Sequence, residues 1–340
     1  MGYELLRCPG CGANLPPPAS PNAILVCEYC GAMLSGAPGA AWAPVLRPID
    51  ERPFDPHRPR VSVAGVRYAV LGRLGRGDRS DVFLARRDAR LTELVVLKLA
   101  RQRDTAPRLA REHATLLALQ SSEAQGHEHF SRLLPQPVSQ AEAFDAAGAH
   151  RPGRVSLWRS GYQHTLADVR AAHGDSLDPR AAVWMWKRVL ELLGFVHRAG
   201  YVHGALLPAH LLVHPRDHGM TAVGWSSAAP IDRRPTLEAP PSAHAAFYPA
   251  SAGRGAIVTP RTDLAMSARC ISWLLGGDPA VGSVGGTVPA ALGRLLQRAQ
   301  DPDAAGVPGE AWALKDALDE AARKDFGPPK FVPFTMPGWR

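Results

Sequence analysis

The sequence has very little lysine. Of its 39 basic residues only five are lysine, at positions 98, 187, 315, 324 and 330. The arginines are spread along the chain rather than massed in one run, although the formal net charge is +8. A basic balance can attract nucleic acid or an acidic partner, but scattered arginines are more typical of a solvated surface. Nucleic acid is therefore not the partner that the composition favours.

The segments that carry a chain to a membrane are also missing. The best apolar stretch, Leu264 to Leu275, is too short to span a bilayer and contains Arg269. No signal-peptide pattern opens the sequence, and Leu6 stands where a myristoylation motif needs Ser or Thr. We therefore expect a cytoplasmic protein with no membrane partner. Its 340 residues, 46% hydrophobic and 21% charged, are enough for one large domain or two unequal ones.

Cysteine is scarce too, but four of the five cysteines form two pairs. Cys8 and Cys11 make one CxxC motif, Cys27 and Cys30 make another, and fifteen residues separate them. Such a pattern resembles a zinc ribbon, in which four thiolates surround one Zn²⁺ and leave no open position for catalysis. We expect a structural zinc that supplies most of the folding energy of so short a segment. Disulfides and a redox CxxC pair are the alternatives.

Changes in composition suggest four parts. Residues 1–35 form the expected zinc ribbon, 36–60 a proline-rich linker, 61–325 the main domain and 326–340 a Pro/aromatic tail. Apolar periodicity within the main domain predicts strands first and helices later. The expected strands cover residues 61–70, 82–85, 94–99 and 155–158. One expected helix begins at Pro107, and five more cover 165–172, 181–197, 262–275, 288–299 and 310–323. Residues 120–154 are expected to be mostly loops around a weak strand.

A glycine-rich stretch lies between the first two expected strands. It reads Gly72-Arg-Leu-Gly75-Arg-Gly77-Asp-Arg-Ser80. Glycines in this spacing also open dinucleotide-binding folds, but those folds need a helix directly after the glycines. Here two further strands follow, which favours a hairpin whose backbone can approach phosphate oxygens.

The stretch from His197 to Val213 resembles the catalytic loop of protein kinases. It reads His-Arg-Ala-Gly-Tyr-Val-His-Gly-Ala-Leu-Leu-Pro-Ala-His-Leu-Leu-Val, with His203 and Pro208 at motif positions. The resemblance extends over about residues 65–323 and implies an α+β, bilobal protein-kinase-like fold, with a small β-rich N-lobe and a helical C-lobe after the ribbon. The Arg-, Ala-, Gly- and Pro-rich composition resembles proteins of GC-rich bacterial genomes, so the expected relatives are bacterial Ser/Thr-type kinases.

The resemblance also assigns a nucleotide site. Gly75 and Gly77 match the glycine-rich loop, and Lys98 matches the lysine that contacts the α- and β-phosphates. Glu112 matches the helix glutamate that pairs with this lysine. The alternatives are a strand-end lysine that reaches into solvent and an ordinary surface glutamate. Asp263 matches an aspartate that steadies the catalytic loop.

The groups that perform phosphoryl transfer are replaced. Ala205 stands where the family has its proton-accepting Asp, His210 where it has a metal-binding Asn, and Gly224 where it has the Asp of Asp-Phe-Gly. Loss of the base alone reduces a rate by roughly 10²–10⁴. Mg²⁺ prefers oxygen ligands, so an imidazole and a glycine make its binding unexpected. The resemblance thus indicates a pseudokinase.

Three further features bear on this interpretation. Asp325-Phe326-Gly327 spells the missing motif but follows the last expected helix, so we interpret it as a helix stop. His203, His210, His214 and His218 are suggestively spaced for metal but straddle a loop, a strand and a turn. Tyr248-Pro249-Ala250 lacks the glutamate of the family's Ala-Pro-Glu motif, and no arginine stands at the matching place near Asp301–Pro308 to pair with it.

We therefore expect a catalytically inactive regulatory or scaffolding module. It would retain weak, metal-independent binding of ATP and use the ribbon, residues 224–250 or the tail to dock an unidentified protein partner, although the tail is more simply expected to pack on its own domain. One alternative is a divergent ATP-dependent protein kinase or other nucleotidyl or phosphoryl transferase. A second is a nucleic-acid-binding zinc-ribbon protein, for which residues 1–36 offer few aromatic or arginine contacts.

Overall fold

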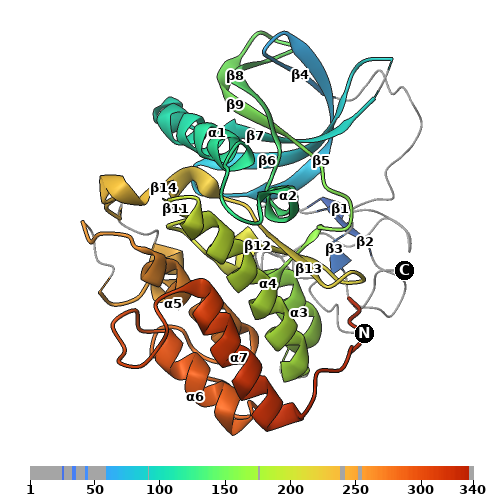
Figure 1. The fold of residues 1–340 in the computed structure, drawn as a ribbon. Helices are drawn as coiled ribbons and strands as arrows, with labels where there is room; N and C mark the ends of the chain where they lie inside the picture. Colours follow the sequence, from blue (N-terminus) through green and yellow to red (C-terminus); the bar gives the residue numbers. More distant parts are fainter. Residues whose placement is uncertain are drawn as a thin grey trace, which may run out of the picture. The chain divides into compact units, whose positions relative to one another are not determined.

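The structure is a computed structural model that describes residues 25–26, 33–35, 43–44, 59–90, 92–174, 177–237, 242–251 and 255–336 (Figure 1). The chain divides into two compact units. Residues 1–106 and 138–158 belong to the first, here called the β-rich unit, and residues 107–137 and 159–339 belong to the helical unit. The chain therefore crosses from one unit to the other three times within this span.

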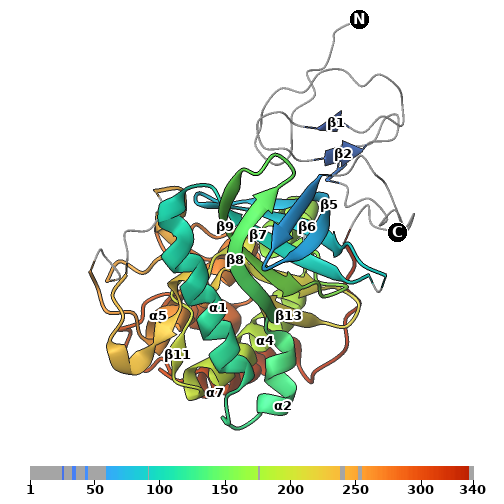
Figure 2. The same ribbon diagram turned by 90° about the horizontal axis from the view of Figure 1, so that it is seen from above.

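Six strands of the β-rich unit close into a barrel in the order β4-β5-β6-β7-β9-β8 (Figure 2). Their bounds are Arg60–Val63 (β4), Val66–Arg76 (β5), Ser80–Arg87 (β6), Leu94–Ala100 (β7), Pro137–Asp145 (β8) and His150–Leu157 (β9). The single strand predicted over 61–70 is in fact two strands. Val63 pairs with Val66 across a two-residue turn in which Ala64 and Gly65 both have positive φ, as tight hairpins require.

The prediction of a weak strand among loops over 120–154 is incomplete, since a full strand, β8, and most of β9 lie there with the short helix α2 (His127–Phe130). Strand β8 is hard to recognise because only Ala143 along it is buried. Strand β9 contains Pro152 and Gly153, which usually count against a strand. Gly153 fits here because an added Cβ would lie 2.9 Å from the Cβ of Ala143. Small side chains let these strands approach closely but weaken their sequence pattern.

Alternation along the strands separates a face that packs into the core of the barrel from a second face. Val95, Leu97 and Leu99 of β7 are at most 2% exposed and pack with buried residues of the neighbouring strands. Those neighbours are Val61, Val63, Tyr68, Ala85, Ala143 and Val155. Since successive side chains point to opposite faces of a strand, the residues between them on β7, Val96 and Lys98, lie on the other face of the sheet.

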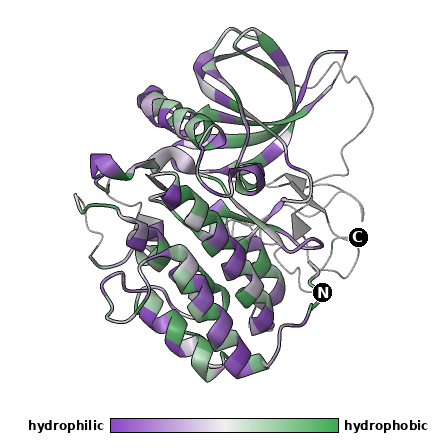
Figure 3. Ribbon diagram, in the orientation of Figure 1, coloured by the Kyte–Doolittle hydropathy of each residue, from purple (hydrophilic) through white to green (hydrophobic). Residues whose placement is uncertain are grey.

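The helical unit contains the long helices that the periodicity predicts. They are α1 (Ala106–Gln120), α3 (Leu166–His173), α4 (Pro179–Arg198), α5 (Pro260–Leu274), α6 (Ala290–Ala299) and α7 (Ala311–Phe326). Helix α4 begins at Pro179 because Asp178 caps it and proline suits the first helical position. Along α4 and α7, Figure 3 shows hydrophobic and hydrophilic stretches alternating, as expected of helices that bury one face. One core joins these helices.

Short strands, one before α3 and the others between α4 and α5, position the segment that resembles a catalytic loop. Strands β10 (His164–Thr165), β12 (Leu211–His214) and β13 (Gly219–Ala222) form one antiparallel sheet. Strands β11 (Tyr201–Val202) and β14 (Ala229–Pro230) form another. The segment 203–210 thus runs from the end of β11 to the start of β12, and ends in a 3₁₀ turn at Pro208–His210.

The tail packs against the helical unit, as its sequence led us to expect. Phe334 stacks on His173 of α3 at 5.2 Å between ring centroids, and His173 also hydrogen-bonds the carbonyl oxygen of Thr335. Phe331 stacks on His218, which in turn stacks on Trp184 of α4 at 4.3 Å. Aromatic contacts of this kind add to the burial of apolar area, so the described part of the tail is a piece of the fold.

Near the N-terminus the described backbone forms three very short antiparallel strands. They are β1 (Leu25–Val26), β2 (Met33–Ser35) and β3 (Ala43–Pro44), in the order β1-β2-β3. Strand β3 lies within the expected proline-rich linker 36–60, and its Pro44 lies opposite Leu34. Proline is tolerated there because β3 is an edge strand. Cys8, Cys11, Cys27 and Cys30 lie outside the described residues.

No helix in the described ranges combines the length and the apolar character that crossing a membrane requires.

Candidate functional site

The second face of the sheet, opposite the barrel core, carries two rows of cross-strand neighbours. In the first row Gly75 lies opposite Val82, Val82 opposite Lys98, and Lys98 opposite Arg154. The second row contains Gly72, Leu84, Val96 and Ser156 in the same order of strands. Side chains that face each other across a strand pair lie on the same side of the sheet. The face therefore combines aliphatic side chains with two cations, and glycine begins each row.

The glycines of this hairpin are not required by its fold. Among the residues that the structure describes, Cβ atoms added to Gly72 and Gly75 would meet no heavy atom within 4 Å, and one added to Gly77 would lie 3.4 Å from the carbonyl oxygen of Ser80. None of the three is among the described glycines with positive φ. Alanine would fit at all three positions. The volume beside the α-carbons of Gly72 and Gly75 is therefore large enough to admit atoms of a ligand.

The tip of the β5–β6 hairpin is held by polar contacts. The N–H of Gly77 donates to the carbonyl oxygen of Ser80 at 2.8 Å. Arg101 donates from Nη1 to the carbonyl oxygens of Gly77 and Asp78 at 3.3 and 3.4 Å. Ser80, which replaces the last glycine of the expected loop, is 6% exposed and begins β6. A serine at this position thus closes the hairpin without disrupting it.

Glu112 is a buried residue of α1. It is 1% exposed and lies on the same helical face as Leu109 and Leu116, which are fully buried. The alternative of an ordinary surface glutamate is therefore wrong. Lys98 belongs to the β-rich unit and Glu112 to the helical unit, so their pairing stays a prediction.

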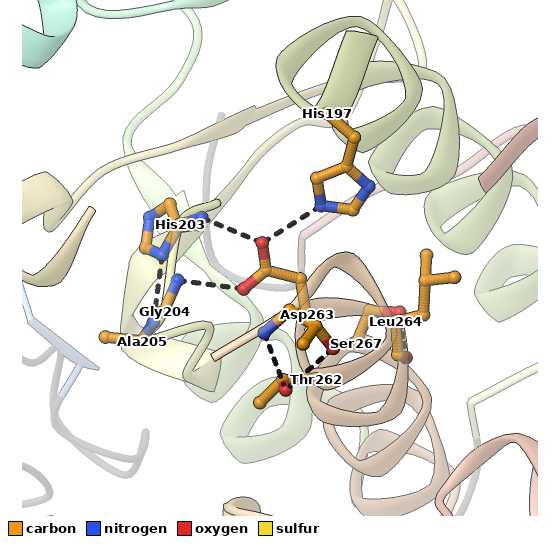
Figure 4. A network of polar contacts seen from close by, with 9 residues as sticks. His197, His203, Gly204, Ala205, Thr262, Asp263, Leu264 and Ser267 are labelled. Carbon is orange, nitrogen blue, oxygen red and sulfur yellow. Dashed lines mark hydrogen bonds and ion pairs between the residues drawn. The ribbon is translucent and has the colours of Figure 1, made fainter. Parts of the chain in front are cut away.

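The segment after β11 is anchored by Asp263, which lies in the first turn of α5 (Figure 4). The Asp263 carboxylate accepts hydrogen bonds from the backbone N–H groups of His203 (2.7 Å) and Gly204 (2.8 Å). Nε2 of His197 on α4 donates to the same carboxylate at 3.0 Å. Asp263 is 0% exposed, so its carboxylate has lost its hydrating water. The three donors compensate for that loss. The predicted steadying role of Asp263 fits this geometry.

The carboxylate also affects a neighbouring tyrosine. Burial, together with the negative charge of Asp263, raises the pKa of Tyr248 to about 12. Tyr248 begins the Tyr248-Pro249-Ala250 sequence, so this part of the motif lies in the electrostatic environment of the loop anchor.

The His203 ring connects the loop to the residues after β13. Its Nε2 donates to the carbonyl oxygen of Val223 at 3.0 Å, and its Nδ1 accepts from the N–H of Ala205 at 3.3 Å. These partners assign the neutral tautomer with the proton on Nε2. The ring also packs 4.5 Å from the ring of Trp225, which is 0% exposed. Trp225 therefore supplies buried aromatic packing directly after Gly224.

Ala205, His210 and Gly224, which the sequence analysis assigned to altered motif positions, lie together in the helical unit. Nδ1 of His210 donates to the carbonyl oxygen of Ala205 at 2.7 Å, which fixes the imidazole against the loop. Gly224 has a left-handed backbone (φ 80°), and an added Cβ would lie 2.7 Å from each of three ring atoms of His210. Real Cβ atoms do not approach so closely. The imidazole therefore fills the space that any side chain at position 224 would need.

The other histidines of the 203–218 series have unrelated surroundings. His214 packs edge-on against Tyr162 at 5.1 Å, and its Nδ1 accepts from the N–H of Asp217. His218 belongs to the stack with Trp184 and Phe331. In the described ranges no group of three or more His, Cys, Asp or Glu side chains is placed to hold a metal ion.

Arg269 of α5 is a residue that sequence reasoning missed. Its guanidinium donates to the carbonyl oxygens of Ala246 (2.9 Å), Pro279 (2.6 Å) and Gln300 (3.2 Å). Ala246 lies just before Tyr248-Pro249-Ala250, and Gln300 just before the Asp301–Pro308 stretch. One arginine therefore ties together the two segments that a glutamate–arginine pair connects in the resembled family. The available signal was an arginine within the otherwise apolar stretch Leu264–Leu275.

Asp325 of the Asp325-Phe326-Gly327 sequence also has a defined position. Its carboxylate accepts from the N–H groups of Ala291 (3.1 Å) and Leu292 (2.7 Å), in the first turn of α6. The residue before α6, Pro289, provides no side-chain cap. Asp325 therefore caps another helix from a distance, and Gly327 ends α7 with positive φ. This confirms the interpretation of the sequence as a helix end.

Comparison with known proteins identifies the fold. No family model matches the sequence, and no curated protein matches it significantly. A solved structure of a rhoptry kinase from Toxoplasma gondii is similar, with a TM-score of 0.56 and 15% sequence identity over 79% of this chain and 84% of that one. At this identity the likeness concerns the fold alone. The chain has a protein-kinase-like fold.

Proposed function

We propose that the kinase-like part of this chain is a catalytically inactive module that binds a nucleotide without Mg²⁺ and regulates or scaffolds a partner protein. The observation that carries the proposal is the contact between His210 and Gly224. The imidazole of His210 occupies the space that a side chain at position 224 would enter, and Gly224 itself offers no carboxylate to hold a metal ion. Ala205, whose carbonyl oxygen binds the same imidazole, has a methyl side chain and cannot accept a substrate proton.

The features retained by the chain support a binding role. The loop that resembles a catalytic loop keeps its anchor, because three donors reach the Asp263 carboxylate. The glycine hairpin keeps open space above Gly72 and Gly75, and Lys98 lies on the same face of the barrel. Glycines that the fold does not need are explained if a ligand approaches their backbone. In this proposal the residues for phosphoryl transfer are replaced, while the residues for nucleotide binding are retained.

A titration of unfolding temperature with ATP tests this function. We expect ATP to stabilise the wild-type protein equally with Mg²⁺ and with EDTA, and Lys98→Ala to remove the effect. ATP turnover should stay at the buffer level with Mg²⁺ or Mn²⁺. Turnover that Lys98→Ala abolishes would instead show an active transferase. No stabilisation by ATP under any condition would remove nucleotide binding from the proposal.

Restoring the missing groups provides a second test. The variant Ala205→Asp/His210→Asn/Gly224→Asp replaces the imidazole and supplies two carboxylates and an amide. Asp is one of the few residues that adopt a left-handed backbone readily, so it suits position 224. We expect this variant to acquire Mg²⁺-dependent stabilisation by ATP that wild type lacks. The matched control is Ala205→Asp/His210→Asn, which keeps Gly224 and should gain less.

For the N-terminal segment we propose a structural zinc bound by Cys8, Cys11, Cys27 and Cys30, which would form a docking module. Two CxxC pairs supply the four thiolates of a closed zinc site. Val26 of β1 pairs with Met33 of β2, so the two strands flank the stretch of sequence that contains Cys27 and Cys30. Metal analysis of the purified protein should find one zinc per chain, and Cys27→Ser/Cys30→Ser should lose it. A chain purified without zinc whose cysteines form disulfides would contradict this assignment.

A further inference from the structure

The segment after α7 lies extended on the helical unit and is held there by its side chains (Figure 1). Burial alternates along it, since Phe334 and Met336 are 8% and 6% exposed while Pro333 and Thr335 are exposed. In the described part of the chain no hydrogen bond between backbone groups joins residues 328–336 to the rest of the unit. Three prolines, at positions 328, 329 and 333, remove donors that such bonds need. The segment is therefore docked like a bound peptide rather than paired into a sheet.

Three aromatic rings from separate elements receive this segment. They are His173 of α3, Trp184 of α4 and His218 of the turn between β12 and β13, here called the tail-binding surface. His218 is stacked between Trp184 and Phe331, with ring centroids at 4.3 and 4.5 Å. Phe334 contacts both His173, at 5.2 Å, and Trp184, at 5.8 Å. Two phenylalanines three positions apart thus account for the ring contacts between the segment and this surface.

The tail occupies this surface without satisfying it. Nε1 of Trp184 and Nε2 of His218 are buried and have no hydrogen-bond partner among the described residues. Buried polar atoms of this kind are unfavourable and uncommon in folded proteins. Phe331 also stays 73% exposed although it stacks on His218. An occupant that leaves polar atoms unpaired and one of its two rings in solvent is suited to displacement by a ligand that fits better.

The segment is joined to the helical unit by a glycine. Gly327 has a positive φ of 76° and directly follows α7, whose last turn is tied to α6 through Asp325. Release of the chain beyond Gly327 therefore leaves both helices in place. The four residues from Gly327 to Phe331 reach about 14 Å at most. A second copy would have to bring the end of its own α7 that close in order to donate its tail, whereas a separate protein has no such restriction.

We propose that the tail-binding surface is the docking site for the partner protein, that its ligand is an extended segment with two aromatic residues three positions apart and a proline between them, and that the chain's own tail occupies the site until such a segment displaces it. This inference rests on the scaffolding role proposed above and does not need nucleotide binding. The chemistry of the ligand is that of the tail, where Pro333 lies between Phe331 and Phe334. Aromatic surfaces bind proline-rich segments well because these segments are already extended and lose little entropy.

Fluorescence anisotropy of a labelled peptide with the sequence of residues 327–336 tests the site in the 340-residue chain. The variant Phe331→Ser/Phe334→Ser removes both rings of the tail and opens the surface. A short tether gives an effective concentration in the millimolar range, so a tail with an isolated Kd of about 0.1 mM weakens peptide binding about tenfold. We therefore expect the double variant to bind the peptide about tenfold more tightly than wild type does. A peptide with serine in place of both phenylalanines should bind neither protein.

A substitution in the surface identifies where the peptide binds. His218→Gly, added to the double variant, removes the ring that stacks between Trp184 and Phe331. Glycine suits this position because φ of His218 is 49°. We expect the gain in peptide affinity to disappear. Arg216→Gly in the same turn, whose side chain is 87% exposed, is the matched control and should keep the gain.

The outcomes separate this inference from the function beneath it. If the folded double variant binds the peptide no more tightly than wild type, the tail is only a structural part of the unit and the proposal fails. If urea titrations show that this variant does not fold, Phe331→Ser decides, because it removes a largely exposed ring, and unchanged peptide affinity would refute the site. A wild-type dimer in size-exclusion chromatography that the double variant dissociates would show tails exchanged between copies instead. ATP stabilisation of the chain is measured without the peptide, so nucleotide binding and docking stand or fail separately.

Discussion

The carboxylate of Asp263 accepts a hydrogen bond from the backbone N–H of His203 at 2.7 Å, sixty residues earlier in the chain. This contact fixes the start of the loop that ends at His210, and a second N–H and an imidazole reach the same carboxylate. Hydrogen bonds from the loop backbone and from the His197 side chain of α4 therefore converge on one buried carboxylate, which holds the loop in a single conformation.

The first prediction concerns this anchor. Asp263→Ala leaves two buried N–H groups and one partly buried imidazole without their acceptor, and each unsatisfied buried group costs about 1–3 kcal/mol. We expect the free energy of unfolding to fall by at least about 3 kcal/mol in urea titrations. Asp232→Ala, which removes an exposed aspartate of the same unit, is the control and should change stability little. Equal effects of the two substitutions would contradict a structural role for Asp263.

The second prediction concerns the contact between His210 and Gly224. Gly224→Ala introduces a Cβ into the imidazole and places a non-glycine residue at positive φ, which alone costs about 1–2 kcal/mol. The collision should disappear in the His210→Ala background, whereas the backbone penalty should persist. A double-mutant cycle of unfolding free energies should therefore show coupling of about 1 kcal/mol or more between the two sites. Additive effects would show that the ring does not occupy the space beside Gly224.

The sequence predicts an element well when the signals that define it are local, that is, when they lie within the element or next to it in the chain. The long helices are predictable, because apolar periodicity and caps such as Asp178 are local signals. Glu112 is predictable as a helix residue on the apolar face. Strand β8 is not, since its small and polar residues lack clear alternation. The periodicity rules therefore succeed where one face is fully buried and fail where it is not.

Residues of the site show the same division. His210 and Gly224 are identifiable from motifs, but their contact depends on the left-handed backbone at 224. The row that joins Lys98 to Arg154 depends on strand register, and in β5 that register shifts between Val70 and Gly72 and again between Arg73 and Gly75. Arg269 binds only backbone carbonyls, which carry no sequence signal. Such contacts become visible only in three dimensions.

The third prediction concerns Arg269. Its three carbonyl partners lie in three separate segments, so loss of the guanidinium should loosen all of them. Arg269→Met keeps apolar volume but removes every donor, and we expect a loss of about 3 kcal/mol of stability. Amide hydrogen exchange of residues 244–250 should accelerate more than exchange in α4. Arg294→Met on α6 is the matched control, and similar exchange in the two variants would argue against a clamp.

The fourth prediction concerns pH. Two of the five lysines, Lys187 and Lys315, contact Asp319 of α7. Although burial acts in the opposite direction, the hydrogen bonds from these two lysines lower the pKa of Asp319 below its ordinary value. A carboxyl whose pKa is lower in the folded than in the unfolded state stabilises the fold above its unfolded pKa. That contribution is lost as the pH falls through the folded pKa.

Asp319→Asn should therefore be less stable than wild type at pH 7, and the difference between the two unfolding free energies should shrink as the pH falls from about 5 toward 3. Asp316→Asn, a neighbouring and largely exposed carboxylate on the same helix, is the control. Because the pairs around Asp319 are partly exposed, salt should also reduce the difference at pH 7. A difference that stays constant from pH 7 to pH 3 would show that Asp319 acts through packing rather than through its charge.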